Sequence, residues 1–161
     1  MKDNLSRAYV AQFCSLGHRA PVAYEFLHKH GQCMAVSPDN AAFEGRGPMG
    51  GCYRNSSRTA FIEGLVYCEG FAVPAGLGIP LEHAWVCDLQ GRVIDPTWPD
   101  GSDYFGVPFT EDFHSEITAE TGYHGILCNL YRLRTYHGSR ELLAYLSGGV
   151  AQPDYMQQIA A

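Results

Sequence analysis

Alternating apolar and polar positions mark three segments in the middle of the chain as β-strands. The stretch LVYCEGFAVP (65–74) alternates and is rich in β-forming residues. LEHAWVCDL (81–89) and RVIDPTW (92–98) show the same character, and a short turn around Gly91 separates them. The loop PAGLGIP joins the first strand to the second. The pattern therefore predicts a sheet that contains at least one β-hairpin.

Helical patterns lie on both sides of these strands. Short helices are predicted over residues 3–16 and 21–30, and a third runs from Cys52 to Gly64, since glycine is favoured just after a helix end. Between the second and third helices, SPDNAAFEGRGPMGG (37–51) predicts a long surface loop of the kind that often borders a site. Residues 99–113 are predicted as turns that wrap the sheet edge. After Gly122 the sequence predicts either a helix, or a strand followed by a helix, and SRELLAYLSGG (139–149) predicts a further short helix.

The turn between the second and third strands decides which side chains share a face. A three-residue loop over 89–91, with Gly91 in the left-handed conformation, pairs Trp85 with Asp95 and makes His83 and Asp95 diagonal neighbours on one face. A two-residue turn would place His83 and Asp95 on opposite faces. A single glycine at the third loop position favours the three-residue turn. We therefore expect an imidazole–carboxylate hydrogen bond between His83 and Asp95.

Composition and charge restrict the class of protein. The 161 residues suit one domain, 1–161, and 46% apolar with 17% charged residues is typical of a globular protein. A net charge of −6 and a pI near 5.5 argue against a nucleic-acid partner. The sequence shows no apolar run of about 18 residues and no secretory signal pattern, so we expect a cytoplasmic protein without a membrane segment.

One of the six cysteines occupies an unusual position. The cysteines are scattered and form no C-x-x-C pair, so most are expected to be reduced, buried thiols. Cys52, however, follows two glycines at the first turn of a predicted helix, where unpaired N–H groups and the helix dipole favour a thiolate and can receive an oxyanion. Cys52, His83 and Asp95 together have the composition of a base-activated nucleophile for acyl transfer.

The ordered pieces GGCYRNSSRTA, YCEGFAVP, PLEHAWV and GRVIDPTW, over about residues 50–98, resemble the core of the transglutaminase-like branch of the papain-type cysteine enzymes. The resemblance implies an α+β fold in which a nucleophile helix packs on an antiparallel β-sheet, with extra helices at both ends. It implies that Cys52 is the nucleophile, that His83 is the general base and acid, and that Asp95 orients the histidine. Family members carry a tryptophan upstream near the oxyanion site, whereas both tryptophans here are downstream. The second oxyanion donor therefore stays open, with Gln32 and Asn40 as candidates.

The expected function is a cysteine-dependent amide-bond hydrolase, a peptidase, amidase or deamidase, that acts on a peptide or protein amide through a thioester and needs no cofactor. A small domain without a second substrate site favours hydrolysis over transfer. The alternatives are an acyltransferase that uses the same triad and a catalytically silent binding or inhibitor protein. A zinc site made of Cys52, Cys68, His83 and Cys87 is a further alternative, although these spacings match no common zinc motif.

Several residues near the triad are candidates for substrate contact. The candidates lie at the start of the nucleophile helix or on the histidine hairpin: Gly51, Tyr53, Asn55, Trp85 and Trp98. Tyr104 is a further candidate for a wall of the substrate groove.

Overall fold

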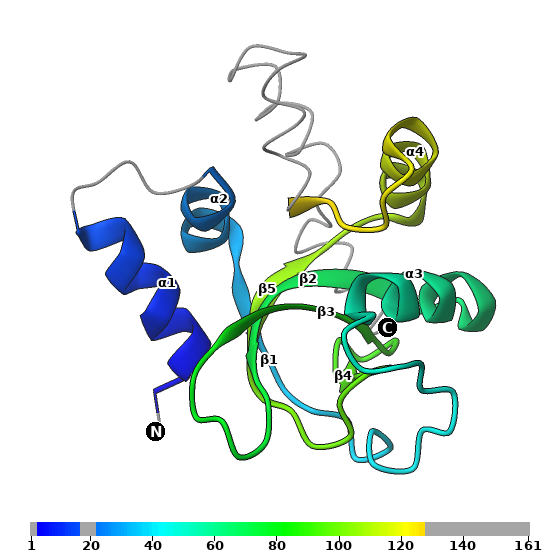
Figure 1. Cartoon of the computed structure of the whole chain (residues 1–161), viewed down its shortest axis with the longest axis horizontal. Helices are drawn as coiled ribbons and strands as arrows, with labels where there is room; N and C mark the ends of the chain where they lie inside the picture. The colour runs from blue at the N-terminus through cyan, green and yellow to red at the C-terminus, as the bar shows by residue number, and fades with distance from the viewer. Residues whose placement is uncertain (1–2, 17–21, 128–161) are drawn as a thin grey trace.

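The computed structural model describes residues 3–16 and 22–127. Within these ranges the chain has an α+β fold with four helices and five strands (Figure 1). The helices are α1 (Leu5–Ser15), α2 (Val22–His30), α3 (Cys52–Glu63) and α4 (Glu111–Thr121). The strands are β1 (Gln32–Met34), β2 (Val66–Val73), β3 (Leu81–Cys87), β4 (Val93–Ile94) and β5 (Ser102–Pro108).

The five strands form one curled antiparallel sheet in the order β1-β5-β2-β3-β4. In Figure 1 the pair α1 and α2 lies to one side of the sheet, while α3 and α4 lie to the other. All four helices nevertheless contribute apolar side chains to one cluster on a single face of the sheet, which includes Phe71, Ala84 and Phe105. The opposite face holds a second cluster around Trp85 and Tyr104. Alternation along the strands thus separates two cores, because successive side chains point to opposite faces.

The β3–β4 turn has the predicted register. The Asp88 N–H donates to Arg92 O at 2.9 Å, and Gly91 adopts a φ of +73°. Cys87 pairs with Val93, and the same register continued places Trp85 opposite Asp95. The three-residue turn is therefore confirmed, and it brings His83 to the same face as Asp95.

The predicted helices over 3–16, 21–30 and 52–64 are confirmed within a residue or two at each end, and Gly64 ends α3 in the left-handed conformation. The loop over 37–51 is confirmed as a segment without helix or strand. Strand β1, before this loop, was not predicted.

Two predictions downstream of the hairpin were wrong. The strand expected over 92–98 ends at Ile94, because the side chain of Asp95 binds the next backbone N–H groups and turns the chain. The segment 99–113 was predicted as turns, but it contains β5, which lies between β1 and β2, and the start of α4. Position 106 of β5 requires a glycine because the strand runs very close to β2 there. An added Cβ would lie 2.2 Å from the carbonyl oxygen of Glu69.

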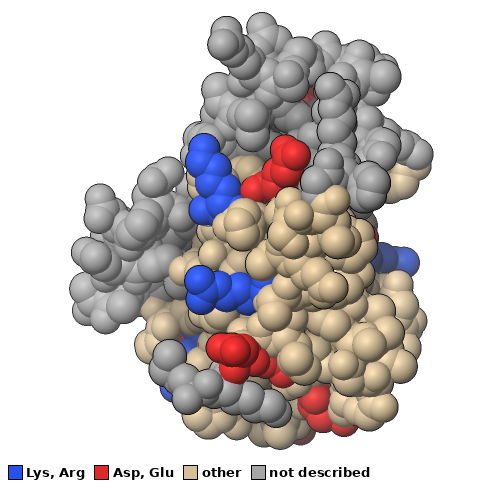
Figure 2. All heavy atoms as spheres, turned by 90° about the vertical axis from the view of Figure 1, so that its left-hand side faces the viewer, with Lys and Arg blue, Asp and Glu red and all other residues tan. Residues whose placement is uncertain are grey.

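In the part of the chain that the structure describes, no helix has the length and apolar character needed to cross a bilayer. Figure 2 shows one face of the molecule, on which acidic and basic side chains lie in small groups separated by uncharged residues. The helix expected at 139–149, and most of the element expected after Gly122, lie outside the described residues.

Candidate active site

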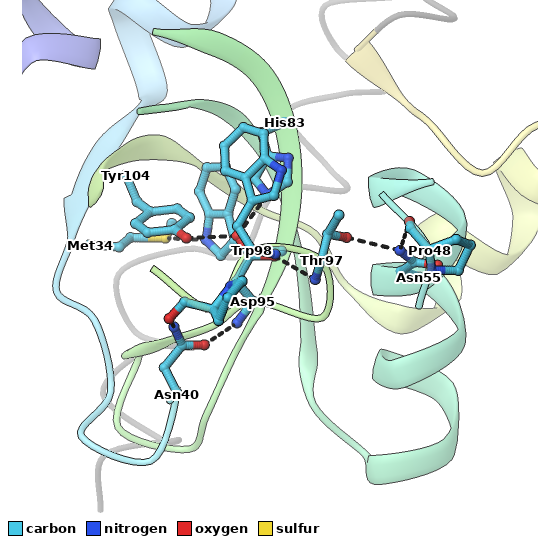
Figure 3. A network of polar contacts seen from close by, with 11 residues as sticks. Met34, Asn40, Pro48, Asn55, His83, Asp95, Thr97, Trp98 and Tyr104 are labelled. Carbon is cyan, nitrogen blue, oxygen red and sulfur yellow. Dashed lines mark hydrogen bonds and ion pairs between the residues drawn. The ribbon is translucent and has the colours of Figure 1, made fainter. Parts of the chain in front are cut away.

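His83 and Asp95 form a buried ion pair at the open end of the β3–β4 hairpin. The His83 Nε2 atom lies 2.7 Å from Asp95 Oδ2, and both side chains are fully buried. Strand β3 supplies the histidine, and the chain just after β4 supplies the carboxylate (Figure 3). A carboxylate at this nitrogen fixes the imidazole tautomer and supports its charged form.

Each carboxylate oxygen of Asp95 accepts two hydrogen bonds. Oδ1 accepts from the backbone N–H groups of Thr97 and Trp98 at 2.8 and 2.9 Å. Oδ2 accepts from His83 and from the hydroxyl of Tyr104, the latter at 2.6 Å. The two backbone bonds hold Oδ1 and leave Oδ2 directed at the imidazole, so the local turn orients the carboxylate.

Asn40 joins the loop over 37–51 to this turn. Its Oδ1 accepts from the Asp95 N–H at 2.7 Å, and its Nδ2 donates to Pro99 O at 3.1 Å. Asn40 was one of the two candidates for an oxyanion donor, but both ends of its amide are engaged in holding the Asp95 turn. The other candidate, Gln32, lies on β1, at the opposite edge of the sheet from β4.

The imidazole of His83 lies flat against Trp98. The ring centroids are 3.5 Å apart and the ring planes are 3° from parallel. Trp98 is 9% exposed, so it covers one face of the imidazole and separates it from solvent. Burial lowers the pKa of His83, but the hydrogen bond to Asp95 and then the proximity of Cys52 outweigh this effect and raise the pKa above its usual value.

Cys52 is the first residue of α3 and is half-buried. Gly51 caps this helix without a side-chain hydrogen bond. The Cys52 sulfur lies close enough to His83 to raise the pKa of the imidazole. Nε2 is occupied by Asp95, and Nδ1 makes no hydrogen bond of ordinary geometry within the described residues. Nδ1 is therefore the imidazole nitrogen that Asp95 does not engage.

Asn55 fixes the start of α3 against the Asp95 turn. It is buried, and its Nδ2 lies 3.0 Å from both Thr97 Oγ1 and Pro48 O. Gly47, whose N–H donates to Pro96 O, adds a second link between the loop and the turn. These contacts hold the cysteine helix and the His83 hairpin in one arrangement (Figure 3).

The remaining predicted residues are placed mostly inside the protein. Trp85 was a candidate for substrate contact, but it is fully buried and its Nε1 donates to Met34 Sδ at 3.3 Å, so it is not exposed to a substrate. Asn55 has the structural role just described, and Tyr53 packs against the larger apolar cluster. Tyr104 is fully buried and contacts Asp95, so the expectation that it walls a groove was wrong.

The zinc alternative depends on Cys52 of α3 and on three side chains of the sheet: Cys68, His83 and Cys87. Cys68 and Cys87 lie 3.5 Å apart at their sulfurs and are buried. No group of three or more His, Cys, Asp or Glu side chains among the described residues has the geometry to hold a metal ion. The Cys68 thiol has a raised pKa because it is buried and lies beside Cys87.

A second buried carboxylate lies on the other face of the sheet. Glu69, on β2, accepts from the Tyr67 hydroxyl at 2.7 Å and from the backbone N–H groups of Ile126 and Leu127. Burial raises the pKa of Glu69 to about 7, although the three hydrogen bonds act in the opposite direction. Strand β2 pairs with the histidine strand β3, and the Glu69 side chain lies on the opposite face of the sheet from His83.

A hollow of about 390 Å³ lies between α3 and α4, and its lining includes Ser57, Phe61 and His114. Cys52, His83 and Asp95 are not part of its lining, so this hollow is separate from the triad. Comparisons of the chain with protein-family models, with curated proteins and with solved structures gave no match.

Proposed function

We propose that this protein is a cysteine-dependent amide-bond hydrolase with a transglutaminase-like core, in which Cys52, His83 and Asp95 act as a triad. The observation that carries the proposal is the buried His83–Asp95 pair, joined at 2.7 Å, on the strand against which the Cys52 helix packs. The direction of the His83 pKa shift, to which Cys52 contributes, agrees with a cysteine beside this imidazole. Acyl transfer by a thiol requires a nucleophile, a base that takes its proton, and a carboxylate that orients the base.

The reaction follows from these positions. His83 takes the thiol proton, and the Cys52 thiolate attacks the amide carbonyl to form a carbon–sulfur bond. As the carbon–nitrogen bond breaks, the imidazolium returns the proton to the departing amine and leaves a thioester. His83 then takes a proton from water, which attacks the thioester, so that the carboxylic acid leaves and the thiol is restored.

The developing oxyanion needs a hydrogen-bond donor near the sulfur. The start of α3 supplies one, because its first backbone N–H groups point out of the helix and Gly51 offers no side chain to occupy them. We propose the Cys52 N–H for this role.

Thiol reactivity tests the proposal, and Cys33 provides a matched control. Cys33 is exposed, and no hydrogen bond joins it to a histidine of the described residues, whereas Cys52 is half-buried. If exposure alone governed reactivity, iodoacetamide would label Cys33 faster. An imidazole-activated thiolate predicts that Cys52 is labelled at least about tenfold faster than Cys33 at pH 6, and that His83→Ala removes the difference. Labelling of Cys52 no faster than Cys33 would contradict the proposal.

Covalent trapping tests the hydrolase step itself. In an Asp95→Asn background, slowed turnover should let intact-mass spectrometry detect an acyl adduct after incubation with a peptide mixture. Cys52→Ala should abolish both the adduct and turnover while leaving the circular dichroism melt unchanged, because Cys52 is half-buried and contributes little packing. Amide hydrolysis that persists in Cys52→Ala would refute the proposal.

A further inference from the structure

Tyr104 makes the shortest of the four hydrogen bonds to Asp95. Its hydroxyl lies 2.6 Å from Oδ2, the same oxygen that His83 contacts at 2.7 Å. The carboxylate oxygen can only accept, so the phenol donates. Burial, and then the negative charge of Asp95, raise the pKa of Tyr104, so the phenol stays protonated.

The fold fixes the Tyr104 ring closely. Its edge meets Trp85 at a ring-centroid distance of 5.1 Å, and its hydroxyl lies beside Gly101, which is buried. A Cβ at Gly101 would lie 2.2 Å from the Tyr104 hydroxyl oxygen, so a side chain there would displace the hydroxyl. The residues around Tyr104 thus leave room for the oxygen atom as well as for the ring.

Two donors on one oxygen weaken each other, because each withdraws negative charge that the other binds. When His83 is charged, it takes more of the charge on Oδ2 and the Tyr104 bond weakens. The Tyr104 bond is therefore strongest when His83 is neutral. Tyr104 and His83 thus share one oxygen of the Asp95 carboxylate.

We propose that Tyr104 is a positioning residue that acts through Asp95 and limits how strongly the carboxylate holds the charged form of His83. The inference rests on the proposed function for its catalytic meaning. A histidine that must both accept and return a proton works best when neither form is held too firmly. The Tyr104 hydroxyl supplies that limit at a pair whose two side chains are fully buried.

The charged and titratable groups near this pair come from several elements. Cys52 on α3 and Asp95 act on His83, while Asp100 and Arg46, on loops, act on Tyr104. The Tyr104→Phe substitution leaves all four in place and removes one oxygen atom. The change in His83 is therefore attributable to the hydroxyl.

The experiment is a histidine-selective NMR titration of the full chain, with the His83 signal identified by its loss in His83→Gln. We expect Tyr104→Phe to raise the His83 midpoint by about half a pH unit or more. Tyr67→Phe is the matched control, because Tyr67 donates to a buried carboxylate on the other face of the sheet. It should leave the His83 midpoint unchanged.

A smaller or downward shift in Tyr104→Phe, or an equal shift in Tyr67→Phe, overturns the inference. If Tyr104→Phe folds poorly, the wild-type chain still decides the question: the Tyr104 Cζ signal must change as His83 titrates, and a constant signal overturns the inference. These readouts do not need a reactive thiol. Failure of rapid Cys52 labelling would thus count against the proposed function alone.

Discussion

The buried carboxylate of Glu69 predicts that stability falls as pH rises. The folded protein raises the pKa of Glu69 from 4.5 to about 7. A group whose pKa is raised on folding stabilises the fold fully below the unfolded value and loses that contribution as pH rises through the folded value. A difference of about 2.5 units corresponds to roughly 3 kcal/mol, most of it lost between pH 4.5 and pH 7.

The hydrogen bonds around Glu69 explain how the neutral form is accommodated. The hydroxyl of Tyr67 has one proton but faces two acceptors, Glu69 Oε1 at 2.7 Å and His124 O at 3.0 Å. A protonated Glu69 can donate to Tyr67, which then donates to His124. When Glu69 ionises, Tyr67 must donate to the carboxylate, and its bond to His124 O is lost.

Urea denaturation of the wild type and of Glu69→Gln at pH 5, 6, 7 and 8 measures this effect. The glutamine variant has a lower stability of its own that does not depend on pH, since the NH2 group of its side chain faces backbone N–H donors. The informative quantity is therefore how the difference in unfolding free energy between the two proteins changes with pH. The wild type should lose about 2–3 kcal/mol relative to Glu69→Gln between pH 5 and pH 8. A difference that is constant with pH, or that moves in the wild type's favour, would refute the reasoning.

Three further substitutions test the packing of the fold, the last of them as a control for the second. Asn40→Ala should lower the free energy of unfolding by about 2–4 kcal/mol, because it leaves the buried Asp95 N–H without its acceptor, and unchanged stability in urea would show that this bridge contributes nothing. Gly106→Ala should cost more than about 3 kcal/mol, since the new Cβ meets the Glu69 carbonyl. Gly64→Ala is the control: Gly64 has a φ of +65°, no atom lies within 4 Å of an added Cβ, and the substitution should cost only about 1 kcal/mol. Equal losses of stability for the two glycine variants in thermal melts would argue that close approach of the strands is not what makes Gly106→Ala costly.

The hairpin could be predicted because its information is local. The single glycine at the third loop position sets the register, and the register alone decides that His83 and Asp95 share a face. The end of α3 at Gly64 is equally local, since it requires only a residue that tolerates a positive φ.

The rest of the site depends on contacts between distant segments. Asn40 reaches Asp95 across 55 positions, and Asn55 reaches Thr97 across 42. The sequence around each asparagine gives no sign of its partner.

Strand β5 was not predicted because a glycine normally indicates a turn, whereas Gly106 allows β5 to approach β2 closely. Gly106 lies opposite Gly70, where both strands need a residue without a side chain. The start of α4, the helix after β5, could have been predicted from the sequence. Thr110 caps α4 and is followed by Glu111 and Asp112 in the first turn, which is a typical helix start.

The order of residues along the chain has a consequence for the ribosome. Synthesis proceeds from the N-terminus, so Cys52 emerges well before His83, Asp95 and Tyr104. Until the β5 segment has been made and has entered the sheet between β1 and β2, the sulfur has no buried imidazole partner. If His83 activates Cys52 as proposed, the activation can arise only after synthesis has passed Pro108, the end of β5.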